Sequence, residues 1–306
     1  MGSMNQTQPL SATDVAAAAD RIRPHVRRTP LLDLEIDGRR VVLKLEYLQR
    51  SGSFKLRGAV NAMLESAADG HIVAASGGNH GLAVATAAAL LGLPATIYLP
   101  ETAPEAKARR IEEAGARLIR HGATFADAAE AAQQAAERPG CHFLHPYNDP
   151  AVVAGQGTLA AEVVADAPGT DAFAVAAGGG GLTAGTALAA GGRHVVAVEP
   201  DGCRALHDAL AAGKPVNSPV DSVASSALGA SQIGAVPFGI VASYGVESVL
   251  VSDEEILRAR DRLWEECRIA VEPAAAASFA AWLAGRVPGQ QPCVVLCGAN
   301  ADWTAG

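Results

Sequence analysis

The sequence contains few aromatic residues, few cysteines and no long apolar run, and each shortage excludes a class of protein. Aromatic residues make up 4% of the chain, so the core must be built mainly from small aliphatic side chains. No apolar stretch approaches the roughly 18 residues that span a bilayer, and we identify no signal peptide. The cysteines are odd in number and form no CxxC pair, which indicates neither a zinc site nor a disulfide framework. They are Cys141, Cys203, Cys267, Cys293 and Cys297.

An excess of positive charge is also absent. The formal net charge of −8 gives no general attraction to nucleic acid or to anionic lipid. With 306 residues, 49% hydrophobic and 18% charged, the chain has the composition of a soluble globular enzyme. We exclude Met1–Met4 from the fold, because this segment has the pattern of an expression remnant before a second initiator methionine. We therefore expect a cytoplasmic protein that binds a small molecule rather than nucleic acid or membrane.

Short β-branched segments alternate with Ala-rich helical segments from Val41 to Asn300. This alternation is typical of parallel sheets flanked by helices, so we predict an α/β fold with two domains. Residues 71–149 form the predicted small domain, and residues 5–70 and 150–306 form the predicted large domain. The expected strands are Val41–Leu45, Ile72–Ala75, Ala95–Leu99, Arg117–Arg120, His142–His145, Ala172–Ala176, His194–Val198, Val249–Val251 and Val294–Leu296.

Lys55 lies in Ser51–Ala59, in the first turn of an expected helix. A cation there is unfavourable against the positive end of the helix dipole. A lysine in Schiff-base linkage, or with a lowered pKa, avoids part of that cost and becomes nucleophilic. The alternative is an ordinary surface lysine near a helix start.

Two loops between a strand and a helix are suited to an anionic ligand. In Ala75–Gly81, glycines and free N–H groups at the helix start suit a carboxylate or a phosphate, or simply make a tight turn. In Gly178–Gly185, four consecutive glycines expose N–H groups in a nest that fits a phosphate dianion. Cys297 ends an apolar strand, where a buried structural cysteine is the default interpretation.

Together these segments resemble the serine/threonine dehydratase and serine racemase family of fold-type II pyridoxal-phosphate enzymes. The resemblance runs from Arg28-Thr29-Pro30-Leu31 to Asn300 and is carried most specifically by Lys44–Gln49 leading into Ser53–Ala59. His145–Thr158, Val198-Glu199-Pro200 and Val271-Glu272-Pro273 are also similar to this family.

The resemblance implies a role for each segment. Lys55 would hold pyridoxal 5′-phosphate as a Schiff base and act as the catalytic base, with Phe54 beside the pyridine ring and Cys297 facing its nitrogen. Asn79 would bond the 3′-oxygen of the cofactor. The phosphate cradle would be Gly178, Gly179, Gly180, Gly181 and Leu182, and the substrate carboxylate would lie against Ser76, Gly77, Gly78, Asn79 and His80. The implied reaction is elimination of water from L-threonine or L-serine, and the implied assembly is a homodimer.

The sequence departs from the family at two functional positions. Gly77 stands where the racemases carry a second serine, so two-base racemisation loses its second acid and elimination is favoured. Glu199 matches one ligand of the family's cation site, but Ala205 stands at the other position. A cation near Glu199 and the carbonyl of Cys203, monovalent rather than tightly bound Mg²⁺ or Ca²⁺, stays open. Ser226, where several relatives carry Asp, leaves the choice among serine, threonine and hydroxyaspartate open.

Three functions remain alternatives to elimination. They are β-replacement as in cysteine synthases, racemisation, and a catalytically silent protein that binds the cofactor or an amino acid. The chain ends soon after Cys297 without the regulatory domain of biosynthetic threonine deaminases, so we expect a catabolic-type enzyme.

Overall fold

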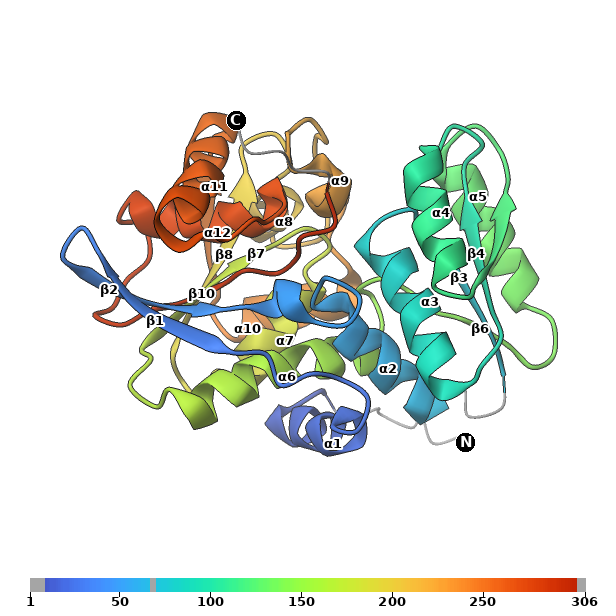
Figure 1. Ribbon diagram of the computed structural model, residues 1–306, viewed down its shortest axis with the longest axis horizontal. Helices are drawn as coiled ribbons and strands as arrows, with labels where there is room; N and C mark the ends of the chain where they lie inside the picture. The colour runs from blue at the N-terminus through green and yellow to red at the C-terminus, as the bar shows by residue number, and fades with distance from the viewer. Residues whose placement is uncertain (1–8, 67–69, 302–306) are drawn as a thin grey trace.

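The computed structural model describes residues 9–66 and 70–301, so the expression remnant at Met1–Met4 lies outside the described residues. Two sheets lie side by side, each covered by helices (Figure 1). We call them, with their helices, the six-stranded lobe and the four-stranded lobe. The predicted α/β class is confirmed, since every strand pair except one is parallel.

The six-stranded lobe has the strand order β1-β2-β10-β7-β8-β9. Its strands are β1 (Leu31–Ile36), β2 (Arg39–Lys44), β7 (Ala172–Ala176), β8 (His194–Pro200), β9 (Glu247–Val251) and β10 (Cys293–Val295). Strand β10, the last one within the residues that the structure describes, therefore inserts between β2 and β7. This order brings the ends of strands from distant parts of the sequence together.

Helices cover both faces of this sheet (Figure 1). On one face lie α11 (Asp253–Cys267) and α12 (Pro273–Leu283), and on the other lie α6 (Pro150–Asp166), α7 (Gly181–Ala189) and α10 (Ala235–Ser243). The lobe also includes α1 (Ala12–Ile22), the 3₁₀ helix η1 (Glu46–Leu48), α8 (Ala205–Ala212) and α9 (Ser225–Leu228). Helix α11 begins directly after Ser252, which caps it, and Glu255 completes the capping box.

The four-stranded lobe has the strand order β5-β4-β3-β6. Its elements are β3 (His71–Ala75), α3 (Asn79–Leu91), β4 (Ala95–Leu99), α4 (Glu105–Glu113), β5 (Arg117–Arg120), α5 (Phe125–Ala136) and β6 (Cys141–Phe143). Along β3, Ile72 and Ala74 pack in the core that includes α3, whereas Val73 and Ala75 pack against α5. The alternation of side chains along a strand thus covers both faces of the sheet.

Two features differ from the sequence-based expectation. Strand β1 had not been expected, and it pairs antiparallel with β2 through a turn in which Asp37 and Gly38 both have positive φ. Helix α2 (Lys55–Ser66) precedes residue 71 but packs Leu56 and Met63 into the core of the four-stranded lobe. The predicted domain boundaries therefore stay a prediction.

The carboxyl ends of the parallel strands position the candidate site. Strands β10 and β7 are neighbours, so Cys297 and the loop that begins at Gly178 leave the same edge of the six-stranded sheet. Phe54 lies beside them, since its N–H donates to the carbonyl of Cys297 at 3.0 Å. Ligands of open α/β sheets bind at this edge.

Candidate active site

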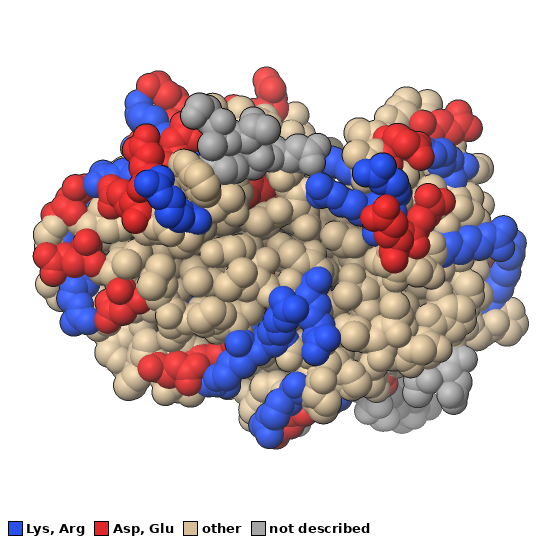
Figure 2. Space-filling view, viewed as in Figure 1, with Lys and Arg blue, Asp and Glu red and all other residues tan. Residues whose placement is uncertain are grey.

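A cavity of about 570 Å³ lies between the two lobes. The molecule is hollowed between the lobes at the upper edge of the face in Figure 2. All the residues that the sequence singled out for the cofactor or the substrate line this cavity: Phe54, Lys55, Ser76, Gly77, Gly78, Asn79, His80, Gly178, Gly179, Gly180, Gly181, Leu182 and Cys297. The structure therefore brings together segments that are up to 243 residues apart, from Phe54 to Cys297.

Lys55 is the first residue of α2 and projects into the cavity. Its Nζ donates to the carbonyl of Pro146 at 2.7 Å and lies 5.2 Å from the centre of the Phe54 ring. Burial lowers the pKa of Lys55 to about 8, an effect partly opposed by the Cys297 thiol. A substantial share of the amine is therefore neutral near physiological pH, which is the form that attacks a carbonyl.

The Cys297 thiol is buried at the wall of the same cavity. Burial raises the pKa of this thiol, and the Glu272 carboxylate raises it further. The thiol is therefore neutral and places no negative charge at this wall of the cavity.

The glycine loop Gly178–Gly181 passes very close to Tyr147. A Cβ on Gly179 would lie 2.2 Å from Cδ1 of Tyr147, and Gly180 has φ of +88°. Helix α7 begins at Gly181, so its first N–H groups have no intrahelical partner and point toward the loop. Only backbone fits here, and the arrangement presents N–H donors as a cradle for a phosphate.

The loop after β3 is shaped by its own hydrogen bonds. Gly78 N–H donates to Oγ of Ser76 at 3.2 Å, and a Cβ on Gly77 would meet only Cδ2 of Leu99, at 3.2 Å. His80 is buried and its Nε2 lies 2.9 Å from the carbonyl of Leu144. Burial, helped by the charge on Lys55, lowers the pKa of His80 to about 3, so this imidazole is neutral. Its geometry is that of a packing residue at the edge of the cavity.

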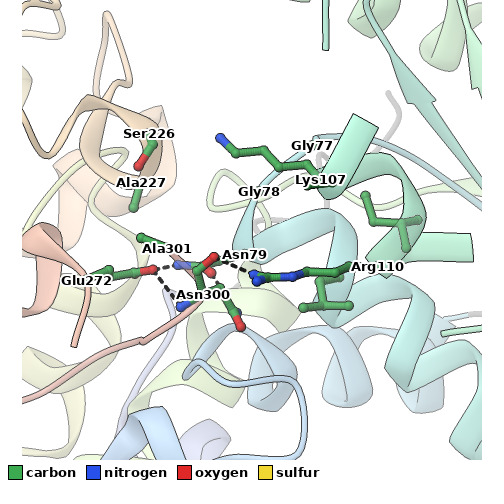
Figure 3. A pocket seen from close by; sticks show the side chains of 13 residues that line it. Gly77, Gly78, Asn79, Lys107, Arg110, Ser226, Ala227, Glu272, Asn300 and Ala301 are labelled. Atoms are coloured by element: carbon green, nitrogen blue, oxygen red, sulfur yellow. Dashed lines mark hydrogen bonds between the residues drawn. The ribbon is translucent and has the colours of Figure 1, made fainter. Parts of the chain in front are cut away.

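Sequence reasoning assigned no role to Glu272 or Asn300, yet both contact Asn79 (Figure 3). Asn79 Nδ2 donates to Oε1 of Glu272 at 2.6 Å, and Asn79 Oδ1 accepts from Asn300 Nδ2 at 2.8 Å. Glu272 lines the main cavity as well as a smaller one that opens beside it. The only sequence signal for Glu272 was the similarity of Val271-Glu272-Pro273 to the family, which assigned this residue no role.

Glu199 is buried at the end of β8 and serves as a cap for α8. Its two oxygens accept from the N–H groups of Leu206 and His207, each at 2.8 Å. Burial raises the pKa of Glu199 to about 8. Within residues 9–66 and 70–301, no group of three or more His, Cys, Asp or Glu side chains could hold a metal ion.

The donor set fits pyridoxal phosphate. A partly neutral lysine, a nest of backbone N–H groups and a neutral thiol face one cavity whose size suits a cofactor with a small substrate. Across the part of the chain that the structure describes, no helix combines the length and apolar character needed to cross a membrane.

The site and the fold thus define an α/β enzyme that binds a phosphorylated aldehyde cofactor through a lysine. Similarity to known proteins agrees. The family model described as "Pyridoxal-phosphate dependent enzyme" matches residues 22–298. L-threonine ammonia-lyase of Geobacter sulfurreducens is 39% identical over 96% of this chain and 76% of its own length. Serine racemase of Arabidopsis thaliana is 35% identical over 94% of this chain and 92% of its own length.

Among solved structures, a threonine deaminase superposes on this chain with a TM-score of 0.91 and 34% identity. The match covers 96% of this chain and 100% of that one. Serine racemase from Dictyostelium discoideum superposes with a TM-score of 0.88 and 30% identity, over 96% of this chain and 99% of that one. The protein therefore belongs to the family of pyridoxal-phosphate dependent enzymes, and pyridoxal phosphate is its cofactor. The resemblance to the serine/threonine dehydratase and serine racemase family is confirmed.

Proposed function

We propose that the protein eliminates water from L-threonine or L-serine and releases 2-oxobutanoate or pyruvate with ammonia. The observation that carries the proposal is Lys55, whose pKa is lowered to about 8 and which shares one cavity with the Gly178–Gly181 loop and Cys297. The similarity to L-threonine ammonia-lyase and threonine deaminase over 96% of the chain supports this reaction class.

Bound through Lys55, the cofactor would supply an electron sink that makes the α-proton of an amino acid removable. The backbone N–H groups of Gly178–Leu182 would hold its phosphate, and the second N–H of Asn79 would face its 3′-oxygen. The Lys55 amine, when not bonded to the cofactor, would take the α-proton of the substrate as general base. Ser76, Gly77, Gly78 and His80 form the wall against which the substrate carboxylate would lie.

The neutral thiol of Cys297 favours elimination. A carboxylate opposite the pyridine nitrogen would stabilise a full positive charge there, but a thiol with a raised pKa does not. Beside a neutral thiol the cofactor would be a weaker electron sink, which would favour prompt loss of the β-hydroxyl over transamination. A hydroxyl leaving group is what serine and threonine provide.

Racemisation is a second candidate, because a serine racemase is among the close relatives. Inversion at the α-carbon needs an acid on the face opposite Lys55. Gly77 offers no side chain at the position where the sequence resemblance places that acid, so we propose elimination as the main reaction.

The decisive experiment incubates the cofactor-loaded protein separately with L-threonine, L-serine and their D-forms, and measures 2-oxo acid and ammonia. We expect both products in equal amounts from an L-substrate, and their absence alongside a changed cofactor spectrum would point to racemisation or β-replacement. Lys55→Ala should abolish turnover, whereas Lys214→Ala, at an exposed lysine just after α8, should leave it unchanged. Retained activity in Lys55→Ala would overturn the assignment.

The finer properties stay proposals with this function. The family resemblance suggests a homodimer and, through the partial match at Glu199, a monovalent cation near that residue. The cysteine pattern and the lack of a recognised signal peptide favour a cytoplasmic location. Size-exclusion chromatography with light scattering tests the dimer, and a comparison of K⁺ with a bulky organic cation tests the ion.

A further inference from the structure

Asn79 lies at a junction between the two lobes. It begins α3 of the four-stranded lobe, whereas Glu272 precedes α12 and Asn300 follows β10 in the six-stranded lobe. Arg110 of α4 adds a second link, since its guanidinium donates to the carbonyl of Asn300 at 2.8 Å. Figure 3 shows Glu272, Asn79, Asn300 and Arg110 in a row across the cleft. The contacts around Asn79 therefore depend on how the lobes sit against each other.

In this row, it is fixed which atom donates and which accepts in each hydrogen bond. Asn300 Nδ2 donates to the carbonyl of Ser51 and to Asn79 Oδ1, each at 2.8 Å, so both of its protons are used. The backbone N–H of Asn300 donates to Oε2 of Glu272 at 3.1 Å. A carbonyl only accepts and a backbone N–H only donates, so these two ends fix the orientation of each amide between them.

The orientation of the Asn79 amide follows. Its oxygen is held by Asn300, and one Nδ2 proton is held by Oε1 of Glu272 at 2.6 Å. The other Nδ2 proton is left for the cavity that Asn79 lines. Glu272 is 4% exposed and acts as acceptor toward both Asn79 and Asn300, which two carboxylate oxygens can do at once.

We propose that Glu272 is a positioning residue that, together with Asn300, fixes the Asn79 amide so that an N–H rather than a C=O faces the 3′-oxygen of the cofactor. The proposal rests on the role proposed above for Asn79, but not on which reaction the enzyme catalyses. On this proposal, the hydrogen bonds among Glu272, Asn79 and Asn300 have a function. They direct an N–H of Asn79 toward the cofactor only when the contacts between the two lobes are formed.

Glu272→Gln tests this directly. The variant keeps the volume of the side chain but has one acceptor oxygen for two donors, so either Asn79 or Asn300 would face an NH₂ group. The side-chain amide of Asn79 can flip only if the amide of Asn300 flips too, and that flip breaks the hydrogen bond from Asn300 Nδ2 to the carbonyl of Ser51. Glu272→Asp keeps both acceptor oxygens on a shorter side chain and serves as the matched conservative variant.

The measurement is the dissociation constant of pyridoxal phosphate, followed with the visible absorbance spectrum of the bound cofactor. We expect Glu272→Gln to weaken binding about 10-fold, as the loss of one hydrogen bond would, and to change the ratio of the absorbance bands. Glu272→Asp should recover much of the affinity. Thermal unfolding of the cofactor-free variants reports separately on damage to the fold.

A double-mutant cycle with Asn79→Ala separates positioning from a purely structural role. If Glu272 acts through Asn79, Glu272→Gln has little further effect on affinity or spectrum once Asn79 is alanine. Equal losses in both backgrounds would overturn the proposal, as would a Glu272→Gln variant with native affinity and spectrum. Because the readout is cofactor binding, failure here is distinct from failure to find elimination activity.

Discussion

Replacing Gly179 with alanine should weaken cofactor binding, because Tyr147 occupies the space that the new methyl group needs. The Cβ would lie 2.2 to 2.4 Å from Cδ1, Cγ and Cε1 of the ring. Carbon atoms in good contact are about 3.5–4.0 Å apart, so the ring or the loop must retreat by about 1 Å or more. The ring is not free to do so, since it packs edge-on against His145 with ring centres 4.7 Å apart. Tyr147 and Asn148 N–H groups also donate to Nδ1 of that histidine.

The magnitude follows from two costs. Overpacking of this kind destabilises a fold by about 1–3 kcal/mol. If the loop moves instead, one hydrogen bond from its N–H groups to a charged phosphate is lost, which is worth about 1.5–3 kcal/mol. Since about 1.4 kcal/mol is tenfold, we expect the dissociation constant of pyridoxal phosphate to rise about 10- to 100-fold. Absorbance titration of the cofactor-free protein measures this, and thermal unfolding measures the stability.

Two further variants make the reasoning refutable. Gly239→Ala, in α10 and with open space around the new Cβ, should leave cofactor affinity unchanged and stabilise the helix by about 0.5–1 kcal/mol. Tyr147→Ala removes the ring, so adding Gly179→Ala to it should cost much less than in the native background. A Gly179→Ala variant with native affinity and stability, or a double variant no better than Gly179→Ala alone, would show that contact with Tyr147 does not shape the cradle.

Three other outcomes follow from the site. The rate at which cofactor-free protein takes up pyridoxal phosphate should rise with pH, reach half of its maximum near pH 8 and level off above that, because only the neutral amine of Lys55 reacts and its pKa is lowered to about 8. A stopped-flow rate with its midpoint near pH 10.5, the ordinary pKa of a lysine, would contradict this. The Gly77→Ser variant should fold, since the new Cβ meets only Cδ2 of Leu99, at 3.2 Å. It should also gain the ability to form D-serine from L-serine, which chiral chromatography measures. A variant that forms no more D-serine than the native protein would refute this. Removal of divalent cations with EDTA should leave 2-oxo acid release unchanged, because both oxygens of Glu199 already accept hydrogen bonds from backbone N–H groups. Activity that is lost with EDTA and restored by Mg²⁺ would contradict this prediction.

The parallel strands and the start of α2 at Lys55 could be predicted, because each is encoded locally by β-branched runs and the helices between them. Strand β1 was missed because its residues are half-exposed and it lies at the edge of the sheet. A usable signal was present: Asp37-Gly38 between two apolar runs is typical of a tight hairpin turn, and both residues do have positive φ.

In the candidate site, too, some residues could be predicted from local sequence patterns and others could not. The glycine loop and Cys297 follow strands directly, so each could be recognised locally, and the family resemblance grouped them. Their shared place at the carboxyl edge of the sheet agrees with the usual position of ligands in open α/β sheets. Glu272 could not be placed, because its bond to Asn79 joins residues 193 positions apart and the bond between Asn79 and Asn300 spans 221. No local pattern encodes which amide faces which carboxylate across a cleft.

Glycines in α6 allow this helix to pack very closely against two helices that border the active site. A Cβ on Gly155 of α6 would lie 2.7 Å from Cα of Gly58 in α2, and one on Gly157 would lie 2.5 Å from the carbonyl oxygen of Gly185 in α7. Helix α6 therefore packs backbone against backbone with the helix that carries Lys55 and with the helix that follows the glycine loop. A contact between side chains can adjust through a change of rotamer, but a contact between two backbones cannot. These two helix crossings therefore fix the distance from Lys55 to the Gly178–Gly181 loop. The glycines of α6 thus contribute to the construction of the active site as well as to the packing of the core.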